Sequence, residues 1–161
     1  MPVNFGEDDL LGSTGKDAHL VHEDITSICL SYTTDRKQLQ QHVPKGFEVT
    51  GPLVQIFASK NIGCSWLAGR RDNVIGVNVT VICEGKIDRV EGSYVVVLWE
   101  DVCEAIMGGR EQTGIPEVYA DIEEVRLHQI KWHASASSHG NKSIEITLNN
   151  AEEVPRSGGH E

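Results

Sequence analysis

The sequence predicts a mainly β (α+β) fold built on an antiparallel, barrel-like or sandwich sheet with short helices. Three observations favour this class. Several segments are rich in β-branched and aromatic residues, two of them alternate strictly between apolar and polar residues, and the segments between them leave room for only two short helices. We therefore expect six or seven strands, without an internal repeat.

The first part of the chain predicts two strands with a short helix between them. The run ITSICLSY at residues 25–32 is typical of a strand. A helix can begin after it, because Asp35 suits an N-cap with Gln38 as its reciprocal partner, and Pro44 ends it. Residues 53–58 predict the next strand.

The rest of the chain predicts four further strands and one further helix. The strands are expected over 77–83, 94–99, 125–134 and 144–148. The nearly unbroken apolar run at 94–99 is expected to be buried on both faces. A helix over 100–107 should end at Gly108 and Gly109, because glycine readily closes helices. A turn near 138–141 should join the last two strands.

Composition and charge exclude some classes of partner. The chain has 161 residues, 39% of them hydrophobic and 24% charged, as in an ordinary globular domain. We expect one domain over 19–150, with a flexible arm at 1–18 and a disordered tail at 151–161. The net charge of −10 works against a surface that follows phosphates, so no nucleic-acid partner is expected.

The sequence shows neither a recognisable targeting signal nor a cysteine pair spaced for a metal or redox site. No apolar run is long enough to span a bilayer, and residues 1–18 lack the pattern of a signal peptide. A cytoplasmic protein without a membrane partner is the expectation. The absence of a C-x-x-C pair favours buried free thiols over a zinc or redox site for the four cysteines, Cys29, Cys64, Cys83 and Cys103.

Two stretches resemble the acetoacetate decarboxylase family. Residues 32–35 (YTTD), the short helix, and then 43–49 (VPKGFEV) and 52–54 (PLV) are similar to the opening of that family. Residues 109–116 (GREQTGIP) resemble its signature of glycine, arginine and glutamate, two further residues, then glycine, an aromatic residue and proline. The resemblance covers roughly 24–149 without large gaps.

The resemblance implies a closed, cone-like antiparallel β-barrel with helices outside, a small-molecule pocket inside, and frequent homo-oligomers. In the family a long C-terminal portion follows where this chain stops. We therefore expect a barrel that is incomplete at the C-terminus. It is either a truncated or mispredicted product, or a shortened form that pairs exposed sheet edges with a partner chain.

The residues that the family uses for catalysis are missing. A lysine amine of depressed pKa condenses there with the substrate ketone, and it directly follows the proline of the signature, beside a second lysine. Here these positions hold Glu117 and Val118. The family's pocket arginine aligns near Ile25, one pocket carboxylate aligns at Phe57, and a second falls within 69–72 without a clear equivalent. We predict no decarboxylation through a lysine imine.

The candidate catalytic residues are Glu117, Glu111 and Arg110. Glu117 would occupy the pocket position of the lost lysine, where burial can raise its pKa enough for proton transfer; the alternative is an exposed loop glutamate. Arg110 and Glu111 belong to the retained signature, and an ion pair bracing the loop is favoured for them. Lys131 or Lys60 could replace the missing amine, but solvated lysines at strand ends are the favoured interpretation.

The histidines predict no metal site, and no cofactor motif is present. His19 and His22 lie three residues apart, a spacing that is common by chance. His128 and His133 lie five apart on one predicted strand, which places them on opposite faces. Each is expected to be structural.

The leading hypothesis is an acetoacetate decarboxylase-like protein with a small-molecule pocket. It would be a lyase or related enzyme acting on a keto acid or polyketide-like metabolite, as in secondary metabolism, by acid–base chemistry. The alternative is a non-catalytic ligand-binding or degenerate homologue, and a third is a structural subunit that contributes only an oligomer interface. Replacing Glu117 by Gln separates the first two.

Overall fold

The computed structural model describes residues 21–154, which form eight strands in two sheets. In the larger sheet, β1 to β4 pair antiparallel in chain order and β5 pairs parallel to β4. Its strands are β1 (Asp24–Thr33), β2 (Phe47–Cys64), β3 (Arg70–Glu84), β4 (Arg89–Glu100) and β5 (Glu117–Tyr119). The smaller sheet is antiparallel and contains β6 (Asp121–His128), β7 (Lys131–Ser138) and β8 (Asn141–Asn149).

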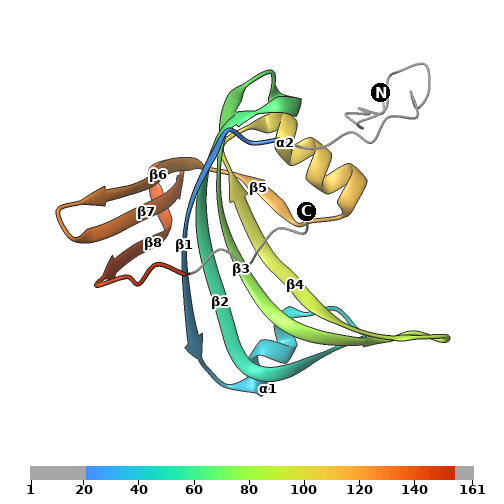
Figure 1. Ribbon diagram of the computed structural model, residues 1–161. Helices are drawn as coiled ribbons and strands as arrows, with labels where there is room; N and C mark the ends of the chain where they lie inside the picture. The colour runs from blue at the N-terminus through green and yellow to red at the C-terminus, as the bar shows by residue number, and fades with distance from the viewer. Residues whose placement is uncertain (1–20, 155–161) are drawn as a thin grey trace, which may run out of the picture.

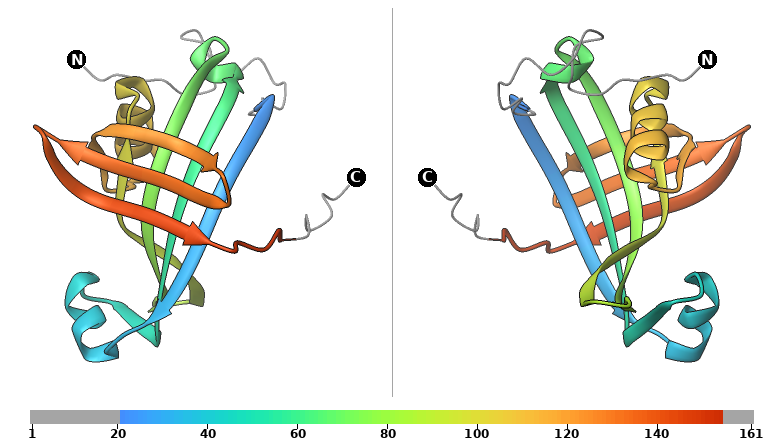
Figure 2. Two further views of the ribbon diagram at one scale, coloured as in Figure 1. Left: turned by 90° about the vertical axis from the view of Figure 1, so that its left-hand side faces the viewer. Right: turned by 90° about the vertical axis from the view of Figure 1, so that its right-hand side faces the viewer.

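The larger sheet is strongly bent, and the smaller sheet lies across its convex side (Figure 1). Helix α2 (Cys103–Gly108) lies on the opposite, concave side, as the two views in Figure 2 show. The mainly β prediction is therefore confirmed. Within residues 21–154, however, the two sheets stay separate and do not close into the barrel that the resemblance implies.

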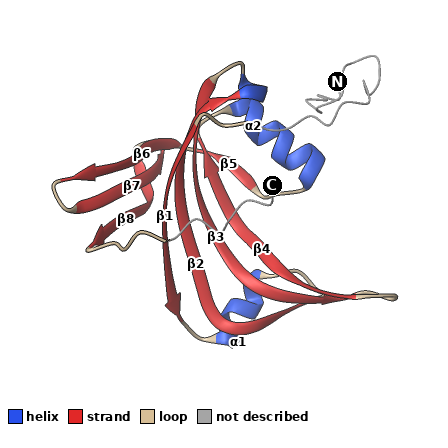
Figure 3. Cartoon of the chain, in the orientation of Figure 1, coloured by secondary structure: helices blue, strands red, loops and turns tan. Residues whose placement is uncertain are grey.

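Among residues 21–154, α-helix is confined to two short regions, and a further 3-10 turn over Ser65–Leu67 joins β2 to β3 (Figure 3). The first is α1 (Arg36–Leu39), continued by a 3-10 turn, and its predicted cap is confirmed because Asp35 Oδ1 accepts a hydrogen bond of 2.9 Å from the Gln38 N–H. The second is α2, which begins later than predicted because Glu100 still belongs to β4.

The α-helix ends at Gly108 with Gly109 as its C-cap, as predicted, but the expected left-handed closure at these glycines is wrong. Gly109 keeps a right-handed φ of −62°, so the chain continues from α2 into a π-helical turn over Gly109–Thr113. Gly114 takes the left-handed conformation instead, with φ 71°, and closes the helix there. The π-helical turn contains Arg110 and Glu111, so the retained signature forms a helix end rather than an open loop.

The predicted strand over 125–134 is a hairpin. Gln129 has φ 56°, and the chain reverses there between β6 and β7. Arg126 is opposite His133, and His128 is opposite Lys131, so the two histidines lie on one face of neighbouring strands. The expectation of opposite faces is wrong. The predicted turn near 138–141 is confirmed, since β7 and β8 are joined at His139 and Gly140.

Two apolar clusters hold the domain together. Between the sheets, the β1–β3 residues Ile28, Ala58 and Ile75 pack with residues of the smaller sheet and the segment before it, namely Ala120, Val125, Ala134, Ala136 and Ile146. Near α1, Leu39 packs with the valines of β2 and β3, which are Val49, Val54, Val79 and Val81. The run at 94–99 is less buried than expected, since only Leu98 is fully buried.

Among the described residues no helix has the length and apolar character required to cross a membrane. All four cysteines are free thiols. Only Cys64 is fully buried, whereas Cys29 and Cys103 are exposed, so the expectation of buried thiols is wrong for these two.

Candidate functional site

The concave face of the larger sheet carries a continuous set of polar side chains. Because Ile28, Ala58 and Ile75 point toward the smaller sheet, their neighbours in sequence point to the concave face. Six side chains there form what we call the polar row. It consists of Ser27, Ser59, Asn61, Asp72, Glu100 and Glu117.

Hydroxyl and amide groups form the first half of the polar row. Ser27 Oγ and Ser59 Oγ lie 2.8 Å apart, Ser59 Oγ donates to Asn61 Oδ1 at 2.8 Å, and Asn61 Nδ2 donates to Asp72 Oδ2 at 3.4 Å. Since a hydroxyl has one proton to donate, Ser27 must be the donor to Ser59. The row thus runs from the edge strand β1 through β2 to β3.

Three buried carboxyl groups form the second half. Asp72 and Glu100 are each 4% exposed and Glu117 is 6% exposed. Glu100 is hydrogen-bonded to both Asp72 and Glu117. One oxygen of each group is buried without a hydrogen bond from any N–H or hydroxyl of the described residues. Since two ionised carboxylates cannot hydrogen-bond to each other, these contacts require protons held between the groups.

Burial raises the pKa of all three carboxyl groups. Desolvation is the largest cause for Glu100, followed by the charge and hydrogen bond of Asp72, and together with Glu117 they raise the pKa of Glu100 to about 10. Desolvation also raises the pKa of Asp72 and of Glu117, although their hydrogen bonds to Glu100 act in the opposite direction. At neutral pH, Glu100 is therefore a neutral acid between two further carboxyl groups.

Two residues of the retained signature, Arg110 and Gly109, contact Glu117. Arg110 Nη1 donates to the Glu117 carbonyl oxygen at 2.9 Å, and the Glu117 carboxyl lies so close to Gly109 that no β-carbon fits there. The expected Arg110–Glu111 ion pair is not formed in residues 21–154, and Glu111 is exposed. Arg110 therefore positions Glu117, whereas Glu111 lies away from the polar row on the surface of the π-helical turn.

Neither candidate lysine lies on the polar row. Lys60 stands between Ser59 and Asn61 on β2, so strand alternation turns it to the other face of the sheet. Lys131 is exposed at the start of β7 in the smaller sheet. This agrees with the prediction of solvated lysines at Lys131, while Lys60 is half-buried within its strand.

Asp72, Glu100 and Asn61 were missed by reasoning from the sequence. Asp72 falls within 69–72, where the resemblance offered no clear equivalent of a pocket glutamate. Extending the alternation of residues 77–83 backwards along β3 would have placed Asp72 on one face with Asn78. For Glu100, the signal was a single carboxylate directly after a long apolar run.

A cysteine–histidine contact lies next to the polar row. His22 Nδ1 is 3.2 Å from the Sγ of buried Cys64. Burial and the nearby charge of Asp72 raise the pKa of the Cys64 thiol, so it stays protonated and is a poor nucleophile. His19 lies outside the described residues. In the described range no three His, Cys, Asp or Glu side chains are arranged to hold a metal ion.

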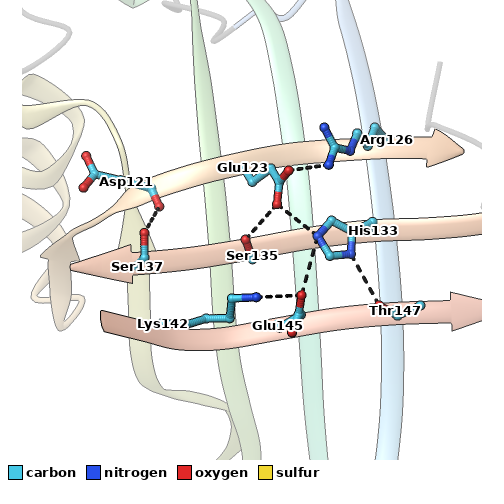
Figure 4. A network of polar contacts seen from close by, with 9 residues as sticks. All are labelled: Asp121, Glu123, Arg126, His133, Ser135, Ser137, Lys142, Glu145 and Thr147. Atoms are coloured by element: carbon cyan, nitrogen blue, oxygen red, sulfur yellow. Dashed lines mark hydrogen bonds and ion pairs between the residues drawn. The ribbon is translucent and has the colours of Figure 1, made fainter. Parts of the chain in front are cut away.

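The outer face of the smaller sheet carries a second polar network (Figure 4). Glu123 accepts hydrogen bonds from His133 Nε2 at 3.0 Å and Ser135 Oγ at 3.1 Å, and it also pairs with Arg126. The hydrogen bond from His133 is the main cause that lowers the pKa of Glu123. This network links β6 and β7 at the surface, and exposed pairs of this kind stabilise a protein only weakly.

The chain is similar to known proteins in sequence and in fold. A sequence model of the acetoacetate decarboxylase (ADC) family matches residues 10–159. Comparison with curated proteins gives no match.

Several solved structures share the fold. Acetoacetate decarboxylase from Legionella pneumophila subsp. pneumophila str. Philadelphia 1 is 18% identical with a TM-score of 0.65, over 81% of this chain and 49% of that one. A second acetoacetate decarboxylase is 20% identical with a TM-score of 0.67, over 78% and 49%. The enduracididine biosynthesis enzyme MppR, in complex with pyruvate, is 17% identical with a TM-score of 0.67, over 98% and 68%.

The chain thus spans about half the length of the two decarboxylases, and identities this low show the fold alone. The match to the family's sequence model, in contrast, extends over nearly the whole chain. The chain therefore belongs to the acetoacetate decarboxylase family.

Proposed function

We propose that this protein binds a small keto acid or polyketide-like metabolite on the concave face of its larger sheet, where Glu117 transfers a proton to the ligand. No lysine imine takes part. One observation carries the proposal: Glu117 is buried at the end of a row of carboxyl groups that share protons. Buried carboxyl groups of raised pKa can act as acids at neutral pH.

The proposed step uses Glu117 as a general acid. A bond at the carbon next to the ligand carbonyl breaks, and its electron pair forms the double bond of an enol. The carbonyl oxygen takes the Glu117 proton, and the departing group leaves as carbon dioxide or as a proton to water. When the enol returns to the ketone, carbon takes a proton from water and the enol oxygen returns its proton to Glu117.

Glu100 supports this role because it is uncharged at neutral pH. A neutral Glu100 donates a hydrogen bond, so Glu117 can lose its proton without standing beside an ionised neighbour. Arg110 holds the Glu117 backbone through its carbonyl oxygen. We assign Glu117 the catalytic role, and we assign positioning roles to Glu100 and Arg110.

The decisive variant is Glu117→Gln, with exposed Glu111→Gln as its matched control. Turnover of acetoacetate and longer β-keto acids would be followed by 13C NMR, and binding by the rise in melting temperature. We expect Glu117→Gln to lower turnover about a hundredfold or more while ligand binding persists, and Glu111→Gln to change neither. Unchanged turnover in Glu117→Gln would exclude the proposed step.

A second candidate is a non-catalytic ligand-binding protein. It is favoured by the close packing of the Glu117 carboxyl against Gly109, which leaves the side chain only 6% exposed. In that case several ligands would raise the melting temperature of the wild-type protein without being converted. Glu117→Gln would then change affinity modestly and have no turnover to remove.

A further inference from the structure

We infer that the ligand of the concave face is a neutral carbonyl compound, such as a β-keto ester or a diketone, rather than the anion of a free keto acid. This inference rests on the proposed function and narrows its substrate class to compounds for which the departing group of the proposed step is a proton rather than carbon dioxide. It is carried by the charges and the apolar residues that surround the polar row.

The polar row contains acids but no cation. Its members are two hydroxyl groups, one amide and three carboxyl groups, so a ligand carboxylate finds no positive partner within it. Two groups that can carry positive charge act on the row from nearby, Arg110 on Glu117 and His22 on Asp72. Arg110 is already held by the Glu117 carbonyl oxygen, and His22 lies against Cys64.

The raised pKa values of the three carboxyl groups indicate that this face disfavours negative charge. Asp72, Glu100 and Glu117 lie together in a position where burial opposes the ionisation of all three, Asp72 opposes the ionisation of both glutamates, and Glu117 opposes that of Glu100. A bound anion would pay the same cost of losing water in these low-dielectric surroundings, and any ionised carboxyl of the row would repel it. A neutral ligand avoids this cost and can still accept a hydrogen bond from a protonated carboxyl.

An apolar surface lies directly beside the acids. Phe57 on β2 is opposite Gly76 on β3, which is opposite Leu98 on β4. A β-carbon at Gly76 would collide with both the Phe57 ring and the Leu98 side chain, so these groups close over the glycine on the concave face. Leu98 is also the strand neighbour of Glu117. The apolar body of a ligand can therefore lie on half-buried Phe57, which packs beside buried Leu98, while the ligand carbonyl faces Glu117.

The test compares ethyl acetoacetate with acetoacetate at neutral pH, since the two share a ketone and differ in charge. Binding of each would be measured by NMR titration of the wild-type protein. We expect the ester to bind about tenfold tighter or more. Equal or tighter binding of the anion would overturn the inference while leaving the proposed function intact. Binding of neither compound would overturn both.

Two pairs of variants locate the binding. Phe57→Ala should weaken ester binding severalfold, whereas Leu127→Ala, an exposed residue of the smaller sheet, should not. Asp72→Asn removes one acid from the row and should bring the affinities for ethyl acetoacetate and acetoacetate closer together. A preference that is the same in Asp72→Asn and in wild type would contradict the electrostatic explanation.

Discussion

Replacing Glu100 by Gln should change how the stability of the protein depends on pH. Glu100 is 4% exposed, and its pKa is raised from 4.5 to about 10 by burial and by Asp72 and Glu117. Above about pH 4.5 the unfolded chain loses this proton while the folded chain keeps it. The unfolded state then binds fewer protons, so the contribution of Glu100 to stability is complete below pH 4.5 and is lost as the pH rises toward 10.

The size of the effect follows from the same shift. Each pH unit between the two pKa values costs about 1.4 kcal/mol, so from about pH 4.5 to pH 7 the wild-type protein loses about 3 kcal/mol through Glu100. Gln has nearly the same shape, can donate a hydrogen bond and does not ionise. The free energy of unfolding of Glu100→Gln, minus that of wild type, should therefore rise by about 3 kcal/mol over this range.

Urea denaturation of both proteins at several pH values measures this difference, with Glu111→Gln as an exposed control. Surface carboxylates of lowered pKa, such as Glu104 and Glu145, lose their contribution as the pH falls. That loss is common to both proteins and cancels in the difference. A difference that stays constant with pH would show that Glu100 ionises normally in the folded protein, and would refute the proposed sharing of protons.

Three further predictions test other parts of the structure. Gly109→Ala should lower the free energy of unfolding by about 1–3 kcal/mol, because its β-carbon collides with Glu117, whereas Gly108→Ala meets no atom within 4 Å and should leave stability equal or slightly higher in thermal unfolding. Asp35→Ala should cost about 1 kcal/mol in urea denaturation by removing the cap of α1, and an unchanged stability would count against that cap. Borohydride with acetoacetate should give no covalent adduct by intact mass, and an adduct would direct peptide mapping to Lys60 and Lys131.

Local signals in the sequence predicted local structure well. The cap at Asp35 and the turn near 138–141 each depend on a few neighbouring residues, and both are confirmed. The predicted continuous strand at 125–134 was wrong because the chain turns at Gln129 and Ile130. Gln129 takes a left-handed conformation although it is neither glycine nor asparagine, so the sequence gives no clear turn signal there. The left-handed closure expected at Gly108 and Gly109 was wrong, although α2 ends there, because glycine permits a left-handed conformation but does not impose one.

The candidate site was only partly predictable, for a different reason. Glu117 followed from the signature that precedes it, and the structure places it in the polar row. Asp72 and Glu100 lie on separate strands, and they meet only through the pairing of β3 with β4 and of β4 with β5. Contacts between residues distant in sequence depend on strand register, which the local pattern of one chain does not fix.

The most direct measurement is a 13C NMR titration of the Glu117 carboxyl group in glutamate-labelled protein, with Glu117→Gln identifying the signal. Desolvation by burial, together with the charge of Asp72, predicts a titration midpoint above the ordinary value of 4.5, so that the group still holds a proton as solvent carboxylates ionise. A midpoint at or below 4.5 would mean that Glu117 is an ionised carboxylate at neutral pH, and it could not serve as the acid proposed for this family member.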